Sequence, residues 1–242
     1  MRRGLPIIAV LLIAPAPALA GGPKTAPVKP AIGSIKGTVI FEGQPPERTT
    51  QRRDSDPYCE KTPGLTDDVV VTKGKLRDVV VRIKNGSMGP HSAPATPAVI
   101  DQVGCTYTPR VVGIVAGQKL AVRNSDGTFH NVHGTVGGKL LWNKPHAPES
   151  PELSLDTTAK PGDVIDVVCD VHPWMHAYAV VHDHPWFAVT RDDGTFELSG
   201  LAPGTYTLEA WHPTLGTKSM TVKIGTGKKA AVTARFSYRS QR

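Results

Sequence analysis

The sequence predicts an all-β protein in which a Greek-key sandwich or barrel is combined with a second, smaller β-sandwich. Short runs rich in Val, Ile and Thr recur along the chain, and Gly, Pro, Asn and Asp separate them, as is typical of strands joined by turns. No segment keeps a helical period long enough to indicate an α-helix. Strands and turns without helices are the pattern of antiparallel sandwiches and Greek-key barrels.

The N-terminal residues 1–20 have the plan of a secretory signal peptide. Arg2 and Arg3 precede an apolar stretch, and the segment ends in Ala-Leu-Ala. The stretch is shorter than the roughly 20 apolar residues of a membrane-spanning helix, and no later segment is apolar enough to span a bilayer. We therefore expect an exported protein, periplasmic or secreted, without a transmembrane anchor in its mature chain. Residues 21–33 are rich in Pro, Gly, Lys and Ala and are expected to form a flexible linker.

Predicted strands begin at Ser34 and continue through a large domain at 34–184. The strand candidates are IKGTVIF at 35–41, DVVVRIK at 78–84, VVGIV at 111–115, KLAVR at 119–123, DVIDVV at 163–168 and AYAVV at 177–181. Turn residues such as Asn-Gly-Ser and Asn-Ser-Asp-Gly separate them. The stretches 86–98 and 143–152, which are rich in Gly or Pro, are expected to be loops.

A second block of strands follows at 185–242, where turn signals such as DDGTF and LAPGTY are dense. Its Asp-Gly-Thr-Phe at 193–196, followed by Leu-Ala-Pro-Gly-Thr-Tyr-Thr-Leu at 201–208, resembles the carboxypeptidase regulatory-like, transthyretin-like module. The module usually opens with GxVxxxxGxP, and a version one residue shorter, from Gly37-Thr38-Val39 to Gly43-Gln44-Pro45, occurs at 37–45 instead. The resemblance therefore leaves two alternatives: a self-contained C-terminal sandwich, or a discontinuous one completed by a strand at 34–46.

The charge is mildly positive, with 28 Lys and Arg against 21 Asp and Glu and a formal net charge of +7. The basic residues are scattered and lack the dense basic stripe with interleaved aromatic residues that nucleic-acid-binding proteins carry, so no nucleic-acid partner is expected. The sequence also lacks a nucleophile elbow, a paired-carboxylate signature and a phosphate-binding loop. We do not expect an enzyme.

Three cysteines are an odd number for an exported protein, so at least one of them stays outside an intramolecular disulfide. Cys59 and Cys105 both lie upstream, whereas Cys169 lies in the octet CDVHPWMH at 169–176. Pairing the first two is the simplest arrangement, and an oxidising compartment permits it. The sequence thus predicts a Cys59–Cys105 disulfide and a free thiol at Cys169.

The octet CDVHPWMH places a thiol, two imidazoles and a thioether in a loop between two predicted strands. A loop can direct Cys169, His172 and Met175 toward one point, which a continuing strand cannot do because its alternate residues face opposite ways. Two imidazoles, one thiolate and a weak axial thioether are the ligands of a blue copper site. The second imidazole is available upstream, in SDGTFHNVH, from either His130 or His133; a strand would place these two on opposite faces.

Two long stretches, YTPRVVGIVAGQKLAVRNSDGTFHNVH and PGDVIDVVCDVHPWMHAYAVV, are similar to the type 1 copper proteins, or cupredoxins, with the CxxHxxM spacing of the plastocyanin and amicyanin-like branch. The resemblance covers roughly residues 96–182. It implies copper, as Cu⁺ and Cu²⁺, bound by His130, Cys169, His172 and Met175. It also implies that Asn131 steadies the ligand loop by hydrogen bonding near the sulfur.

This resemblance implies a copper-binding electron carrier that exchanges one electron with a redox protein partner, whose identity the sequence does not give. His172 would be the ligand nearest the surface and the exit for the electron. Two other functions remain open: copper sequestration or delivery, with contributions from His133, His176, His182 and His184, and a metal-free module that binds glycans or proteins. Zinc held by Cys169, His172, His130 and His176 is a further alternative, since zinc accepts such ligands without Met175.

Overall fold

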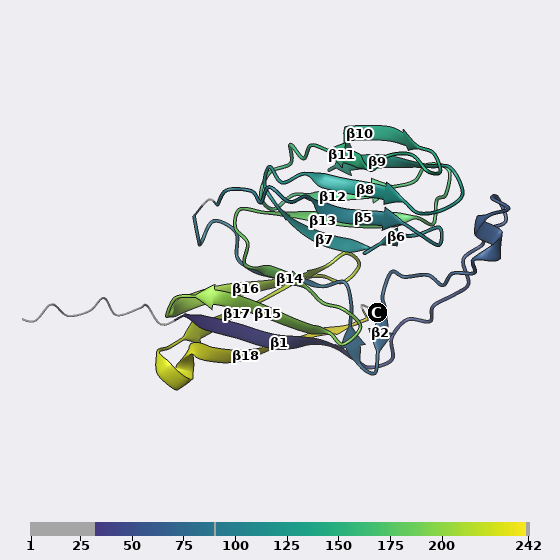
Figure 1. Cartoon of the computed structure of the whole chain (residues 1–242). Coiled ribbons are helices and arrows are strands. Elements are labelled where there is room, and N and C mark those ends of the chain that lie inside the picture. The colour runs from purple at the N-terminus through teal and green to yellow at the C-terminus, as the bar shows by residue number, and fades with distance from the viewer. Residues whose placement is uncertain (1–31, 90, 241–242) are drawn as a thin grey trace, which may run out of the picture. The chain divides into compact units, whose positions relative to one another are not determined.

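The computed structural model describes residues 32–89 and 91–240, and in this part of the chain all regular structure is β-strand except for two short 3₁₀ helices (Figure 1). The predicted all-β class is therefore confirmed. The predicted signal peptide at 1–20 lies outside the described residues, and so does the predicted linker as far as residue 31. No helix among the described residues is long and apolar enough to cross a membrane.

The strands form four sheets, which we describe as two sandwiches. The first sandwich contains β1 (Gly33–Glu42), β2 (Val71–Thr72), β3 (Lys75–Leu76), β4 (Val80–Ile83), β14 (Phe187–Val189), β15 (Thr195–Leu201), β16 (Gly204–His212), β17 (Gly216–Ile224) and β18 (Ala231–Arg239). The second contains β5 (Ala98–Gln102), β6 (Tyr107–Thr108), β7 (Val111–Val115), β8 (Leu120–Asn124), β9 (His130–Val136), β10 (Lys139–His146), β11 (Leu153–Leu155), β12 (Val164–Val168) and β13 (His176–His182). The 3₁₀ helices are η1 (Cys59–Lys61) and η2 (Gly227–Ala230).

The first sandwich, which we call the β1 sandwich, combines strands from both ends of the described chain. One sheet contains β15, β1, β3 and β2 in this order, with β18 also paired to β1, and the other contains β14, β4, β16 and β17. Alternate residues of β1, such as Ile35 and Val39, are fully buried and pack with Phe196, Leu208 and Phe236. This alternation is what a strand with one face in a core requires.

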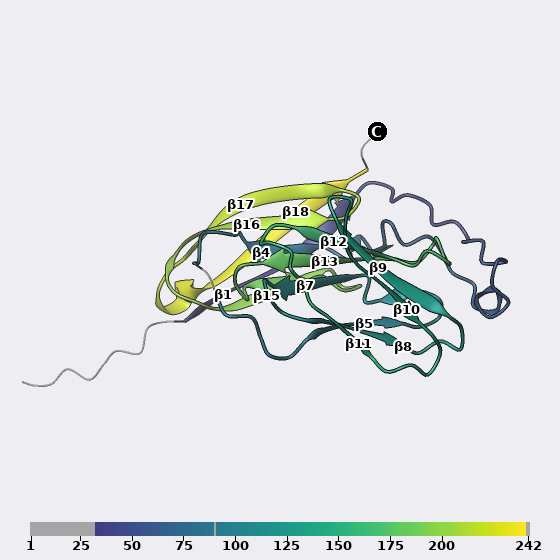
Figure 2. The ribbon, with the colours of Figure 1, turned by 90° about the horizontal axis from the view of Figure 1, so that it is seen from above.

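The second sandwich, which we call the β9 sandwich, is made from one continuous stretch of chain. Its sheets have the orders β10-β9-β12-β13-β7 and β11-β8-β5-β6, and both views show them facing each other (Figures 1 and 2). Ile100, Ile114, Leu120 and Ile165 are fully buried between them. Cys169 packs in the same core, which therefore surrounds the predicted site.

The strand pairing differs from the domain limits expected at 34–184 and 185–242. β1 pairs with β15 and β18, and β4 pairs with β14 and β16, so the region 33–83 contributes strands to the sheets of the C-terminal block. β4 is buried on both faces: Val81 packs in the β1 sandwich, while Val80 contacts Val111 and Val180. Burial on both faces explains why DVVVRIK is a continuous apolar run rather than an alternating one. Where one independently folding unit ends and the next begins stays a prediction.

Three pairings depart from the purely antiparallel pattern expected. β1 with β18, β5 with β8, and β7 with β13 are parallel, because each pair joins strands that a crossover separates in the sequence. The stretch expected to be a loop at 143–152 also begins as strand, since β10 extends to His146. β10 lies at the edge of its sheet, where Pro145, which has no N–H to donate, is tolerated.

Candidate metal centre

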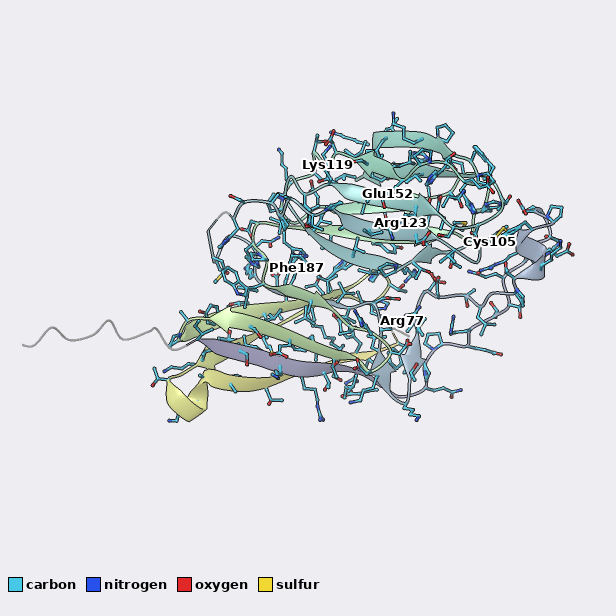
Figure 3. The ribbon with its side chains drawn as sticks, viewed as in Figure 1. Arg77, Cys105, Lys119, Arg123, Glu152 and Phe187 are labelled. Atoms are coloured by element: carbon cyan, nitrogen blue, oxygen red, sulfur yellow. A yellow bond between two sulfur atoms is a disulfide. The ribbon has the colours of Figure 1, made fainter. Side chains whose placement is uncertain are left out.

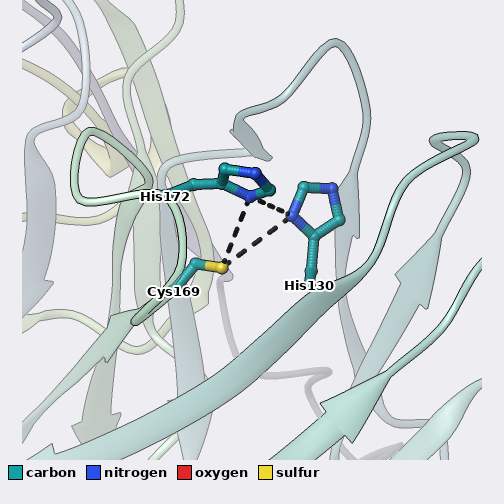
Figure 4. Close-up of side chains that lie close together, drawn as sticks. All are labelled: His130, Cys169 and His172. Atoms are coloured by element: carbon teal, nitrogen blue, oxygen red, sulfur yellow. Dashed lines mark hydrogen bonds between the residues drawn. The ribbon is translucent and has the colours of Figure 1, made fainter. Parts of the chain in front are cut away.

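Three buried side chains from distant parts of the sequence converge in the β9 sandwich: His130, Cys169 and His172 (Figure 4). Nδ1 of His130 lies 2.9 Å from Nδ1 of His172, and Sγ of Cys169 lies 3.8 Å and 3.7 Å from these two nitrogens. The point equidistant from the three atoms is about 2.0 Å from each, close to usual metal–nitrogen and metal–thiolate bond lengths of about 2.0 and 2.3 Å. The triangle therefore fits one transition-metal ion close to its plane.

The ligand loop, Cys169–Met175, connects β12 to β13 as a tight turn. Cys169 N donates a hydrogen bond to Met175 O at 3.3 Å, and Met175 N donates to His172 O at 2.9 Å. These bonds fold the loop back on itself, so that Cys169 and His172 both point inward. The Met175 side chain is 1% exposed and packs in the same core cluster as Cys169. The loop thus buries the thiol, one imidazole and the thioether together.

The third side chain comes from β9, whose first residue is His130. His130 is fully buried, whereas the side chain of His133 is 28% exposed and its Nδ1 lies 2.8 Å from Oδ1 of Asp170. Residues three apart on a strand face opposite sides. Of the two candidates in HNVH, the structure brings His130 to Cys169 and places His133 outside the triangle.

Hydrogen bonds to carboxylates fix which nitrogen of each imidazole faces the sulfur. Nε2 of His130 donates to Oδ2 of Asp126 at 3.1 Å, and Nε2 of His172 donates to Oδ2 of Asp56 at 3.1 Å. A ring that carries its proton on Nε2 keeps a lone pair on Nδ1, a tautomer that follows from this network. Two Nδ1 lone pairs 2.9 Å apart repel each other unless a cation, either a proton or a metal ion, lies between them. The donor set therefore fits a metal.

The two imidazoles of the triangle, His130 and His172, have pKa values shifted in opposite directions. Burial by itself lowers the pKa of His130, but hydrogen bonds with Asp126 and Cys169 outweigh it and raise the pKa to about 8. Burial lowers the pKa of His172, and the hydrogen bond with Asp56 only partly opposes it. Although burial raises the pKa of Asp56, hydrogen bonds from backbone N–H groups, Thr128 and His172 outweigh it and bring the pKa to about 2. Asp56 is thus ionised near neutral pH and stabilises a proton on Nε2 of His172.

Asn131 connects the strand of His130 to the ligand loop. Asp170 N donates to Oδ1 of Asn131 at 2.7 Å, and Nδ2 of Asn131 donates to Oδ2 of Asp170 at 2.6 Å and to Oδ1 of Asn143 at 2.8 Å. Asp170 is the residue after Cys169. Asn131 therefore holds the ligand loop at Asp170, next to Cys169, through hydrogen bonds with both the main chain and the carboxylate of Asp170.

A covering segment, residues 49–66, lies against the ligand loop. The disulfide between Cys59 and Cys105, with an S–S distance of 2.02 Å, ties this segment to the β9 sandwich; Figure 3 marks Cys105. Nε1 of Trp174 donates to Cys105 O at 3.0 Å, and the Arg53 guanidinium lies 5.8 Å from the centre of the Trp174 ring. His172 is consequently only 2% exposed. The surface position that the resemblance implied for His172 is not seen, because the covering segment occupies it.

Sequence reasoning did not single out Asp56 or Asp126. Asp126 lies four residues before His130 in NSDGTFH, so its proximity to a candidate ligand was a usable signal. Asp56 is 116 residues away from His172 and belongs to an unremarkable polar stretch. No local pattern could have connected them.

The other histidines of the region lie away from the triangle. Nε2 of His176 is 3.4 Å from Oδ1 of Asp166, and its side chain is 38% exposed. His182 is fully buried and stacks on Phe187, with 4.1 Å between ring centroids; Figure 3 marks Phe187. His184 donates from Nε2 to a backbone carbonyl at 3.1 Å. His176 is therefore not placed as a fourth ligand of the kind that a tetrahedral zinc site would need.

No protein-family model matches the sequence, and no curated protein sequence matches it. Solved cupredoxin structures show a partial likeness. Amicyanin from Paracoccus versutus (Thiobacillus versutus) is 22% identical with a TM-score of 0.32, over 42% of this chain and 98% of that one. An amicyanin mutant in the Cu(I) state is 20% identical with a TM-score of 0.31, over 42% and 99% of the two chains.

A purple cupredoxin from Nitrosopumilus maritimus is 24% identical with a TM-score of 0.27, over 35% of this chain and 98% of that one. TM-scores near 0.3 do not support an argument about fold or function. The function is therefore inferred from the side chains of this protein and their contacts.

Proposed function

We propose that this chain is an exported protein that binds one copper ion and transfers single electrons. His130, Cys169 and His172 would hold the ion, and Met175 would be a further, weaker ligand. Bound copper would supply the one-electron chemistry, since ligands of this kind suit both Cu⁺ and Cu²⁺. The protein's own contribution is to keep the ligands in place, orient both imidazoles and exclude water.

The observation that carries this proposal is the buried triangle of two Nδ1 atoms and one sulfur. Its edges of 2.9, 3.7 and 3.8 Å fit one ion, and a carboxylate holds the far nitrogen of each imidazole. Metal-binding histidines commonly donate their second N–H to a carboxylate in this way, which fixes the ring orientation and raises the basicity of the ligand nitrogen. A rigid, preoriented ligand set changes little between oxidation states and so favours rapid electron exchange.

Copper sequestration or delivery is the second candidate, and the burial of His172 favours it. An electron exit at this imidazole would need contact with a redox partner, but His172 is 2% exposed beneath the covering segment. A covered copper ion is better suited to retention. If the protein transfers electrons, the route would not pass directly from His172 to a partner but through the covering segment or another part of the β9 sandwich.

A copper titration of the mature protein, followed by optical and EPR spectroscopy, tests the proposal. We expect one copper per chain, an intense visible thiolate-to-copper band and reversible oxidation and reduction. The Cys169→Ser variant should lose the visible band because it lacks the thiolate. A colourless wild-type protein in Cu²⁺ would contradict the copper assignment. A band that cannot be cycled reversibly, or copper that dissociates on reduction, would favour sequestration or delivery.

A further inference from the structure

One half of the Cys59–Cys105 disulfide is connected to a proposed copper ligand by a carboxylate. Oδ1 of Asp56 accepts a hydrogen bond from Cys59 N at 3.0 Å, while Oδ2 of the same carboxylate accepts from Nε2 of His172 at 3.1 Å. The sulfur itself is also near, since Sγ of Cys59 lies 3.8 Å from Nε2 of His172. A thiol at position 59 would therefore lie beside the second nitrogen of this imidazole.

The other half of the disulfide repeats this arrangement. Oδ2 of Asp126 accepts from Cys105 N at 2.9 Å and from Nε2 of His130 at 3.1 Å. The two sets, Asp56 with Cys59 and His172, and Asp126 with Cys105 and His130, each have ligand atoms within 4.8 Å of one another. In the disulfide form, the sulfur–sulfur bond prevents the two cysteines from binding a metal as thiolates.

A buried positive charge lies next to this sulfur pair. Nη1 of Arg53 donates to Gly104 O at 2.9 Å, one residue before Cys105, and the Arg53 side chain is almost completely buried. Two thiolates that bind one Cu⁺ carry a net charge of −1, and a nearby guanidinium stabilises such a charge in a buried environment. Thiolates are soft ligands, which favour Cu(I), together with zinc and iron–sulfur clusters, over hard cations.

We propose that Cys59 and Cys105, once reduced, form a second copper site that is selective for Cu(I) and adjoins the first. A dithiol reductant would give two electrons and two protons to the disulfide, becoming a disulfide itself. One Cu⁺ would then displace the two thiol protons and form two copper–sulfur bonds, with no change in its oxidation state. The protein would hold one copper in its disulfide form and two in its dithiol form.

Access to the buried disulfide would come from local opening of the covering segment. Cys59 and Cys105 are both fully buried, and attack on a disulfide requires access to a sulfur atom. The covering segment contains only η1 and one isolated bridge, between Thr50 and Leu65, and most of its other backbone hydrogen bonds are internal. Because its regular pairing is so sparse, local opening would need to break mainly the side-chain hydrogen bonds of Arg53 and Asp56 to the β9 sandwich, without global unfolding.

The test is the Cu(I) stoichiometry of the full mature chain in its two thiol states. One sample keeps its disulfide; the other is reduced with dithiothreitol, which is then removed without oxygen. Each sample competes for Cu(I) with a coloured chelator. We expect one tightly bound copper in the disulfide form and two in the dithiol form. The same stoichiometry in both forms would overturn the proposal.

Two variants separate this proposal from the proposed electron-transfer site. The Cys59→Ser, Cys105→Ser double variant should bind one copper whether or not it has been reduced, and circular dichroism checks its fold. The Cys169→Ser variant disables the first site and should still gain one Cu(I) on reduction. Failure of reduced Cys169→Ser to bind copper would overturn the second site alone, whereas a colourless wild-type protein in Cu²⁺ would overturn the first alone.

Discussion

The two sandwiches bury similar sets of apolar residues but differ in what their buried polar side chains contact. In the β1 sandwich, Tyr238 and His212 bind main chain: the Tyr238 hydroxyl donates to Ala210 O, and Nδ1 of His212 accepts from two backbone N–H groups. In the β9 sandwich, His130 and His172 contact each other and Cys169. A buried polar group bound to main chain stabilises a scaffold, whereas groups that converge on one point form a site.

The largest expected effect concerns the β1 sandwich and should leave copper binding intact. Phe236 is 3% exposed and lies in that core. Phe236→Ala should lower the free energy of unfolding by about 3–5 kcal/mol, because it removes apolar contacts and leaves a cavity. Chemical denaturation measures this. At low temperature, where the variant remains folded, its copper spectrum should match that of the wild type; a lost spectrum would show that the two sandwiches are not functionally separate.

Removing His130 should affect copper binding rather than the stability of the β1 sandwich. We expect His130→Ala to weaken copper binding more than about 100-fold, since loss of an outer partner alone weakens metal binding by about 10–100-fold. Competition with a chelator measures the affinity. His212→Asn is the matched control, because His212 is similarly buried but is the last residue of β16 in the β1 sandwich. Equal copper affinities of His130→Ala and the control would remove His130 from the ligand set.

Replacing Asn131 should weaken copper binding less than replacing His130, because Asn131 contacts the ligand loop and would not contact the metal. Asn131→Ala removes three hydrogen bonds, of which two go to Asp170. We expect copper affinity to fall by about 10–100-fold and the visible band to shift. Asn143→Ala removes one hydrogen bond to Asn131 and one to Asp170 but leaves both bonds between Asn131 and Asp170 in place, so it should change both quantities less. The reverse order of the two variants would contradict the role given to Asn131.

The pH dependence of stability should depend on His212. Burial, with a smaller contribution from the charge of Arg110, lowers the pKa of His212 to about 4. The unfolded chain, with its ordinary histidine pKa of about 6.5, then binds a proton more readily than the folded one between about pH 6.5 and 4, so acidification in this window destabilises the fold. His212→Asn should lack this component. Parallel Tm curves of both proteins across the window would show that His212 does not titrate as described.

The smallest effect is expected at the surface of the β9 sandwich. Nε of Arg123 lies 2.6 Å from Oε2 of Glu152, and both side chains are well exposed (Figure 3). Exposed ion pairs contribute about 0–1 kcal/mol. Arg123→Ala should therefore change the free energy of unfolding by less than about 1 kcal/mol and leave the copper spectrum unchanged. A larger change would mean that this pair supports the ligand strands.

Local patterns in the sequence were sufficient for many of the strands and for three of the four candidate ligands. A run rich in Val and Ile bounded by turn residues is a property of neighbouring residues, so β7, β12 and β13 lie where the sequence predicts strands. The spacing of Cys169, His172 and Met175 is likewise local, because one tight loop carries all three. The cysteine count suggested the pairing of Cys59 with Cys105 that the structure contains.

The sequence by itself thus determined the all-β class, the loop Cys169–Met175 and the pair of candidate histidines upstream, His130 and His133. Only the tertiary structure decided the parallel pairing of β1 with β18, the carboxylates of Asp56 and Asp126 at the two imidazoles, and the burial of His172. These features join residues that are far apart along the chain or that lie on either side of a turn. Their energies arise from contacts formed after the chain has folded, and no short stretch of sequence records them.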